Sequence, residues 1–288
     1  MDLATLWYLT IGTLVVATAM TLWERQAHAQ RSAELGIWAA AYGVFTLGCF
    51  LAMYRNVLPG IAGPALTNVV MVLGYAMVLQ GVLALDGKGL RLTLLAGFLV
   101  LLGLAWFVGG TGMGSAFWNH LGALPIAVIC ALTALALFRS SAAKGLRSRP
   151  LAIVVFACHS LTYATRAFVV PAVVPHYGDG ILTIVARITM YEAVLFTVAM
   201  PMSLIALVRE EERAQLLAHA RTDFLTGLYN RQGLFELGPE RLRSQWRSGS
   251  HTLPARDLDP FKALHATYGH NSGHPVPILF PKLHQAAA

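Results

Sequence analysis

Charged residues are scarce in this sequence. Among the 288 residues only 12% are Asp, Glu, Lys or Arg, whereas 56% are hydrophobic, and in a soluble globular protein roughly a quarter of the residues are charged. The surplus of apolar side chains excludes an ordinary water-soluble protein. It predicts a multispan membrane protein with the lipid bilayer as its main partner.

Cysteine is also rare. The three cysteines, Cys49, Cys130 and Cys158, lie far apart within apolar runs, so the sequence indicates neither a disulfide framework nor a zinc site. The net charge is +7, but the basic residues are scattered and form no stripe with interleaved aromatic residues. This pattern disfavours nucleic acid as a partner.

Long apolar runs dominate the first two thirds of the chain. A helix needs about 20 apolar residues to cross a hydrocarbon core about 30 Å thick. Seven segments qualify, namely residues 3–23, 35–54, 62–85, 90–109, 117–138, 151–170 and 181–208. The first run lacks the basic leading region of a cleaved signal, so we expect it to be a retained span.

The loops between the predicted spans differ in charge. One set contains eight basic residues, Arg25, Arg31, Lys88, Arg91, Arg139, Lys144, Arg147 and Arg149. The opposite set contains Arg55, and Arg166 lies just inside the end of its span. Because basic loops stay in the cytoplasm, we expect the amino terminus outside and the carboxyl terminus in the cytoplasm.

Several polar side chains lie within the predicted spans, where they are costly and often functional. In the outer half these are Asn68, His120, Arg166, Arg187 and Glu192, and His159 lies near mid-span. Arg187 and Glu192 are separated by about 140° around one helix, so we expect Glu192 to pair with Arg166 instead.

Two interpretations of these polar groups stay open. His120, Arg166, Arg187 and Glu192 either satisfy one another inside the bundle or line an outward-facing pocket for a small ligand. Ion transport is disfavoured because the sequence contains neither paired broken helices nor an internal repeat.

The composition changes beyond Val208. Residues 209–288 include ten basic and eight acidic residues, which predicts a linker helix over 209–222 and a water-exposed module over 223–288, after a sensor-like region over 1–208. Pro201 is expected to kink the last span. The linker is either a solvated helix or part of a short dimer seam formed by Leu204, Leu207, Ala214 and Leu217.

Two motifs identify the module. Residues 223–231, DFLTGLYNR, resemble the pattern D-x-L-T-G-L-x-N-R, and residues 257–274, DLDPFKALHATYGHNSGH, resemble D-x-D-x-F-K-x-x-N-D-x-x-G-H-x-x-G-D. In this order and at this spacing, the pair resembles the opening of GGDEF domains, the diguanylate cyclase family. Many members of that family carry multispan sensors, and the resemblance implies a protein of the bacterial inner membrane.

The resemblance implies an α/β domain that joins two GTP molecules, one on each of two facing domains, into cyclic di-GMP. Asp257 and the Leu258 carbonyl are then Mg²⁺ ligands, and Lys262 binds phosphate. A homodimer or a heterodimer with related cyclases is the expected assembly. In the first motif, Gly227 is expected in a turn, Asn230 as the N-cap of the next helix, and Asp223 in an ion pair with Arg231.

This copy departs from the family pattern. His265 and His274 replace the residues that contact guanine, and Ala266 replaces the Asp after the first of them. A carboxylate accepts from two guanine donors, whereas a neutral imidazole has one acceptor. Pro254 and Pro260 disfavour the strand and the phosphate-binding turn, and Gly238-Pro239 is expected to interrupt the first helix.

The sequence ends at Ala288 without a Gly-Gly-Asp/Glu-Glu-Phe loop. It therefore predicts a mainly α protein: a polytopic seven-helix membrane bundle, a cytoplasmic linker helix and a partial α/β GGDEF domain. Two hypotheses stay open. The chain is a truncated, degenerate member of the cyclase family without activity, or a non-catalytic membrane receptor that binds a ligand and pairs with intact relatives.

Overall fold

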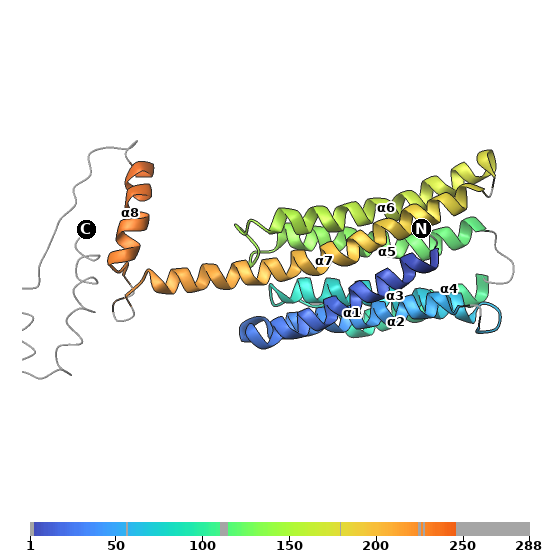
Figure 1. The fold of residues 1–288 in the computed structure, drawn as a ribbon, viewed down its shortest axis with the longest axis horizontal. Coiled ribbons are helices and arrows are strands. Elements are labelled where there is room, and N and C mark those ends of the chain that lie inside the picture. The colour runs from blue at the N-terminus through green and yellow to red at the C-terminus, as the bar shows by residue number, and fades with distance from the viewer. Residues whose placement is uncertain are drawn as a thin grey trace, which may run out of the picture. The chain divides into compact units, whose positions relative to one another are not determined.

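The computed structural model describes residues 3–55, 57–109, 115–178, 180–223, 226 and 228–245. The chain divides into two compact units, Met1–Glu211 and Glu212–Ala288. Figure 1 shows that helices make up nearly all of the described structure. Each unit is considered by itself below.

Seven described helices are long and apolar enough to cross a membrane, which confirms the predicted multi-pass architecture. They are α1 Leu3–Ala27, α2 Ser32–Met53, α3 Ala62–Ala84, α4 Leu92–Gly109, α5 Ser115–Arg139, α6 Arg149–Tyr177 and α7 Gly180–Ala220. A short 3₁₀ helix, η1 Ala29–Arg31, precedes α2, and α8 Arg231–Gln245 belongs to the second unit.

Prolines lie inside three of these helices without ending them. They are Pro125 in α5, Pro171 and Pro175 in α6, and Pro201 in α7. In a bilayer the backbone has no water to bond, so a helix that keeps its remaining hydrogen bonds is favoured over one that unwinds. Consequently α7 is one helix of 41 residues, and the predicted linker positions up to Ala220 are its last turns.

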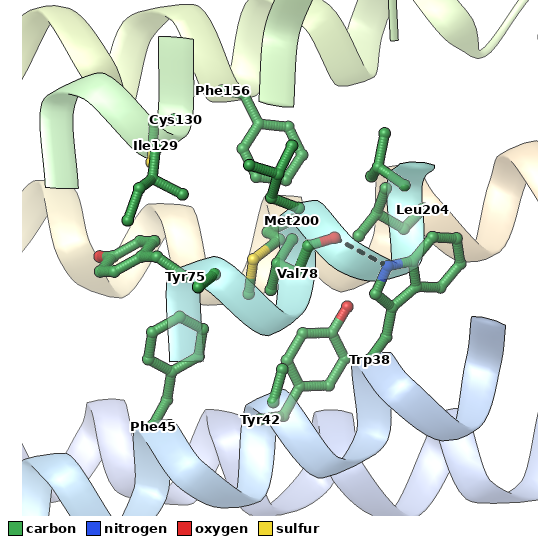
Figure 2. Packing of buried hydrophobic residues seen from close by; sticks show 14 of the residues in the cluster. Trp38, Tyr42, Phe45, Tyr75, Val78, Ile129, Cys130, Phe156, Met200 and Leu204 are labelled. Atoms are coloured by element: carbon green, nitrogen blue, oxygen red, sulfur yellow. Dashed lines mark hydrogen bonds between the residues drawn. The ribbon is translucent and has the colours of Figure 1, made fainter. Parts of the chain in front are cut away.

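Helices α2 and α3 pack closely in the core. Trp38 on α2 is fully buried, and its indole N–H donates to the Val78 carbonyl of α3 at 3.3 Å, as Figure 2 shows. A Cβ added to Gly81 would lie 2.3 Å from the Trp38 indole nitrogen. Glycine on α3 therefore sets how closely the two helices approach.

Among the seven membrane-type helices, α4 is the least buried within the bundle. Leu92, Leu94, Val100, Leu101 and Val108 are exposed there, whereas only Leu102, Trp106 and Gly109 of this helix are buried. A helix with such an apolar exposed face is stable where lipid covers it.

In the second unit the described residues form the last turns of α7, the helix α8 and one antiparallel bridge between Thr222 and Tyr229. The predicted α/β core lies outside the described residues. The predicted interruption at Gly238-Pro239 is wrong, because α8 continues through Pro239 to Gln245. A proline removes one helical hydrogen bond, and here the remaining bonds of the helix maintain it.

Candidate functional site

A buried histidine connects three helices of the bundle. His159 on α6 is fully buried. Its Nε2 lies 2.7 Å from the Tyr75 hydroxyl of α3, and its Nδ1 lies 2.8 Å from Glu192 of α7. The ring also stacks on Phe196, with 3.6 Å between centroids. Both ring nitrogens therefore have partners, as a buried imidazole requires.

The predicted pair of Arg166 and Glu192 is wrong. Glu192 contacts His159 through both carboxylate oxygens, and among the described residues Arg166 forms no ion pair. His159, which lies on the same helix as Arg166, reaches the Glu192 carboxylate directly and takes the place of the expected arginine. This pairing uses Glu192 and leaves the guanidinium of Arg166 available.

A cavity of about 800 Å³ lies in the bundle beside this histidine. Its wall comes from α1 to α7 and includes Tyr75 and Phe196, the neighbours of His159. Aromatic side chains of α1, α4 and α6 line it as well, namely Trp7, Trp106 and Tyr163. The cavity also reaches Arg55 in the loop between α2 and α3.

The four predicted pocket residues are not brought together. Of these, Arg166 lines the cavity, whereas His120, Arg187 and Glu192 do not. His120 lies against Phe168, with 5.9 Å between ring centroids, and Arg187 is exposed on α7. The structure thus keeps one member of the predicted group at a cavity and adds Arg55 and Asn68 to it.

Charged side chains near the end of α7 form a second polar cluster, which we call the collar. Arg209 donates from Nε to Glu24 of α1 at 3.0 Å. Glu210 accepts from the Ser148 hydroxyl at 2.6 Å, and Glu211 accepts from Arg31 at 2.6 Å. Three consecutive residues of α7 are thereby bonded to three different elements.

Further contacts strengthen the collar. Arg31 also donates to Glu34 at 2.8 Å and to the Leu85 carbonyl at 3.1 Å. Glu210 accepts from the backbone N–H groups of Arg147 and Ser148. Charged groups of this kind are stable near a membrane boundary when each has a partner.

The predicted dimer seam on α7 is not available as a whole. Leu204 and Leu207 are buried in the core of their own bundle, at 0% and 2% exposure. Leu217 is exposed, as is Ala214. Because the first two leucines already pack within the chain, the four residues do not form one free stripe.

The described residues of the first motif form a capped turn. Asp223 accepts from the backbone N–H and the hydroxyl of Thr226, each at 3.1 Å. The Asn230 side chain accepts from the Gly233 N–H at 2.9 Å, which confirms it as the N-cap of α8. Arg221 pairs with Glu236 at 2.7 Å and so joins the turn to the helix.

The second motif lies outside the described residues, and so do its predicted site residues Asp257, Leu258, Lys262, His265 and His274. Gly227 of the first motif lies outside them too. In the part of the chain that the structure describes, no cluster of three or more His, Cys, Asp or Glu side chains suits a metal ion.

Sequence reasoning missed Tyr75 and the collar. A single tyrosine in an apolar run gives no periodic signal, because its partner lies 84 positions away in sequence. The collar did leave a signal. Glu24 and Glu34 lie beside the basic loop that contains Arg31, and acidic residues at such a boundary indicate pairing with the basic ones.

Comparison with known proteins identifies the carboxyl-terminal part of the chain. Residues 220–278 match the family described as "Diguanylate cyclase, GGDEF domain". No curated protein and no solved structure matches the chain. With the motif at residues 223–231, this match identifies a GGDEF-domain family sequence in the segment that follows seven membrane-type helices.

Proposed function

We propose that this chain is a signalling protein of the bacterial inner membrane, in which the seven-helix bundle acts on the GGDEF segment through α7. The supporting observation is continuity of the chain. Helix α7 begins in the bundle at Gly180 and ends at Ala220, the residue at which the family match begins. A single helix without a break carries a change at one end to the other.

The collar supports the same proposal. Because Arg209, Glu210 and Glu211 bind α1, the α5–α6 loop and η1 respectively, a rearrangement of any of these elements alters the hold on α7. Loss or exchange of these hydrogen bonds would shift α7 from one position in the bundle to another, and no covalent step is needed.

Hydrogen exchange tests this coupling. We expect Glu210→Ala to speed amide exchange over residues 212–220 by about tenfold, because the carboxylate accepts three hydrogen bonds from the α5–α6 loop. Arg213→Ala, at an exposed position of the same helix, is the matched control. Equal exchange in both variants and the parent would refute the role of the collar in holding α7.

The proposal includes no cyclase activity for this chain. Asp257 and the Leu258 carbonyl are oxygen donors of the kind that Mg²⁺ prefers, and Lys262 suits a GTP phosphate. His265 and His274, however, stand where the family resemblance implies guanine contacts. A site built to hydrogen-bond its substrate loses several powers of ten when those partners are missing.

The assay uses the purified chain in detergent with Mg²⁺ and GTP, followed by chromatography of the nucleotides, and an intact family member as the positive control. We expect no cyclic di-GMP above the background without protein. Product that forms here and disappears in Asp257→Ala would overturn the non-catalytic part of the proposal.

We further propose that the amino terminus is outside and the α7 end cytoplasmic. Eight basic residues in one set of loops against two in the other support this orientation. Reporter fusions after Lys144 and Val208 should both give cytoplasmic signals. A periplasmic signal from either fusion would contradict it.

A further inference from the structure

We propose that the cavity in the bundle binds an amphipathic organic anion, with an apolar body against the aromatic wall and an acidic head group on Arg166 and Arg55. The volume of about 800 Å³ falls within the range of about 300–1,000 Å³ typical of small-molecule sites. This proposal depends only on residues of the bundle. A negative result for ligand binding would therefore not contradict the proposed signalling through α7.

The charge of the lining residues carries the argument. Arg55 and Arg166 are the charged residues of the described lining, and no acidic residue is among them. Neither guanidinium forms a hydrogen bond or ion pair with the described residues. Arginine stays protonated, so a half-buried Arg166 inside a membrane span favours an anionic partner.

Several uncharged polar groups of the wall already form hydrogen bonds. Thr10, Thr67 and Thr189 donate to carbonyls of their own helices at 2.8–2.9 Å. The Tyr75 hydroxyl bonds to His159, and the Asn68 amide donates to the Pro64 carbonyl. The two guanidinium groups add charged donors for a ligand head group, and each suits a carboxylate or phosphate fork.

The remaining wall specifies the body of the ligand. Aromatic and aliphatic side chains from all seven helices supply it, among them Trp7, Phe45, Met71, Trp106, Tyr163 and Phe196. The carboxylate of Glu192 lies outside the lining and contacts His159, so it does not occupy the site of the head group. The cavity thus combines an apolar wall with two cationic side chains. An acid with an apolar chain or ring fits this combination better than a compact, strongly hydrated anion does.

Two lining tryptophans provide the measurement. We expect bromine-labelled dodecanoate to quench the fluorescence of the full chain in maltoside detergent saturably, and the matching brominated alcohol not to do so. Trp7→Phe combined with Trp106→Phe should remove most of the saturable quenching. Trp23→Phe, at an exposed position of α1, should retain it.

Substitution of the arginines tests the head-group site. Arg166→Gln should weaken dodecanoate binding about 10- to 100-fold, as loss of a charge-assisted hydrogen bond does. Arg187→Gln removes the same charge from α7 outside the cavity and should leave binding unchanged. Arg55→Gln lies in an exposed loop, so it tests the site even where Arg166→Gln fails to fold.

A brominated phosphatidylglycerol distinguishes a lipid from a free acid as the source of the anion. Saturable, Arg166-dependent quenching by the lipid alone assigns the site to membrane lipid, and quenching by dodecanoate assigns it to a free acid. Equal quenching by the alcohol and the acid, or binding that neither arginine substitution weakens, would overturn the proposal.

Discussion

The collar and the cavity use arginine in opposite ways. In the collar, Arg31 bonds to Glu211, Glu34 and the Leu85 carbonyl, and Arg209 bonds to Glu24. At the cavity, Arg55 and Arg166 form no ion pair with the described residues. A partnered charge holds elements together, whereas an unpartnered charge in a hollow space is available for a ligand.

The largest expected effect is on stability, and it differs between an arginine of the collar and an arginine of the cavity. Arg31→Ala should lower the free energy of unfolding by about 2–3 kcal/mol, because it leaves the buried Glu34 carboxylate and Glu211 without their partner. Arg166→Ala should change it by less than about 1 kcal/mol, since no ion pair is lost. Titration with denaturing detergent measures both.

Arg25→Ala provides a control near the collar, because this exposed arginine forms no ion pair with the described residues. A loss in Arg166→Ala as large as that in Arg31→Ala would break the comparison. It would show that Arg166 contributes to the stability of the fold and is not free to bind a ligand.

A smaller effect compares packing in the two regions. Gly81→Ala should destabilise the bundle by about 1–2 kcal/mol, because the added Cβ lies 2.3 Å from the buried Trp38 indole. Gly122→Ala lies at the cavity, where the nearest atom is the Asn68 side-chain oxygen at 3.2 Å. We expect a change there within about 0.5 kcal/mol.

Thermal unfolding in detergent measures the two glycine variants side by side. Similar losses in both would contradict the contrast between a closely packed α2–α3 contact and a hollow cavity. A stabilised Gly122→Ala would sharpen it, because alanine favours a helix over glycine when space allows.

The smallest expected effect depends on pH. Burial raises the pKa of the Asp86 carboxyl, but hydrogen bonds from Ala142 and Ser141 outweigh burial and hold the pKa below its usual value of 3.8. A lowered pKa stabilises the fold above the ordinary pKa, and this stabilisation is lost as the pH falls below it.

Unfolding measured between pH 6 and pH 3 tests this linkage. The parent chain should lose stability below about pH 4, and Asp86→Asn should show a flatter profile over the same range. Arg166→Ala should keep the parent slope, because the described cavity lining contains no acidic residue. Identical profiles for the parent and Asp86→Asn would exclude this contribution.

The spans were predictable because their signal is local. Twenty successive apolar residues have few ways to avoid water other than a membrane helix, so the predicted segments agree with α1 to α7 to within several residues at most ends. Asn230 was predictable for the same reason, since a cap and its helix are neighbours in sequence. The prediction that Pro239 interrupts a helix was wrong because α8 tolerates the loss of one backbone hydrogen bond.

The sequence alone determined a multi-pass helical bundle, its basic loop asymmetry and the family of the segment after α7. Only the tertiary structure decided that Glu192 joins His159 and that Arg166 lines a cavity with Arg55. The hydrophobicity of a segment predicts that it lies in the membrane, but it does not predict which neighbouring helix each side chain faces. Pairing depends on how the helices rotate and pack, and residues far apart in sequence fix that together.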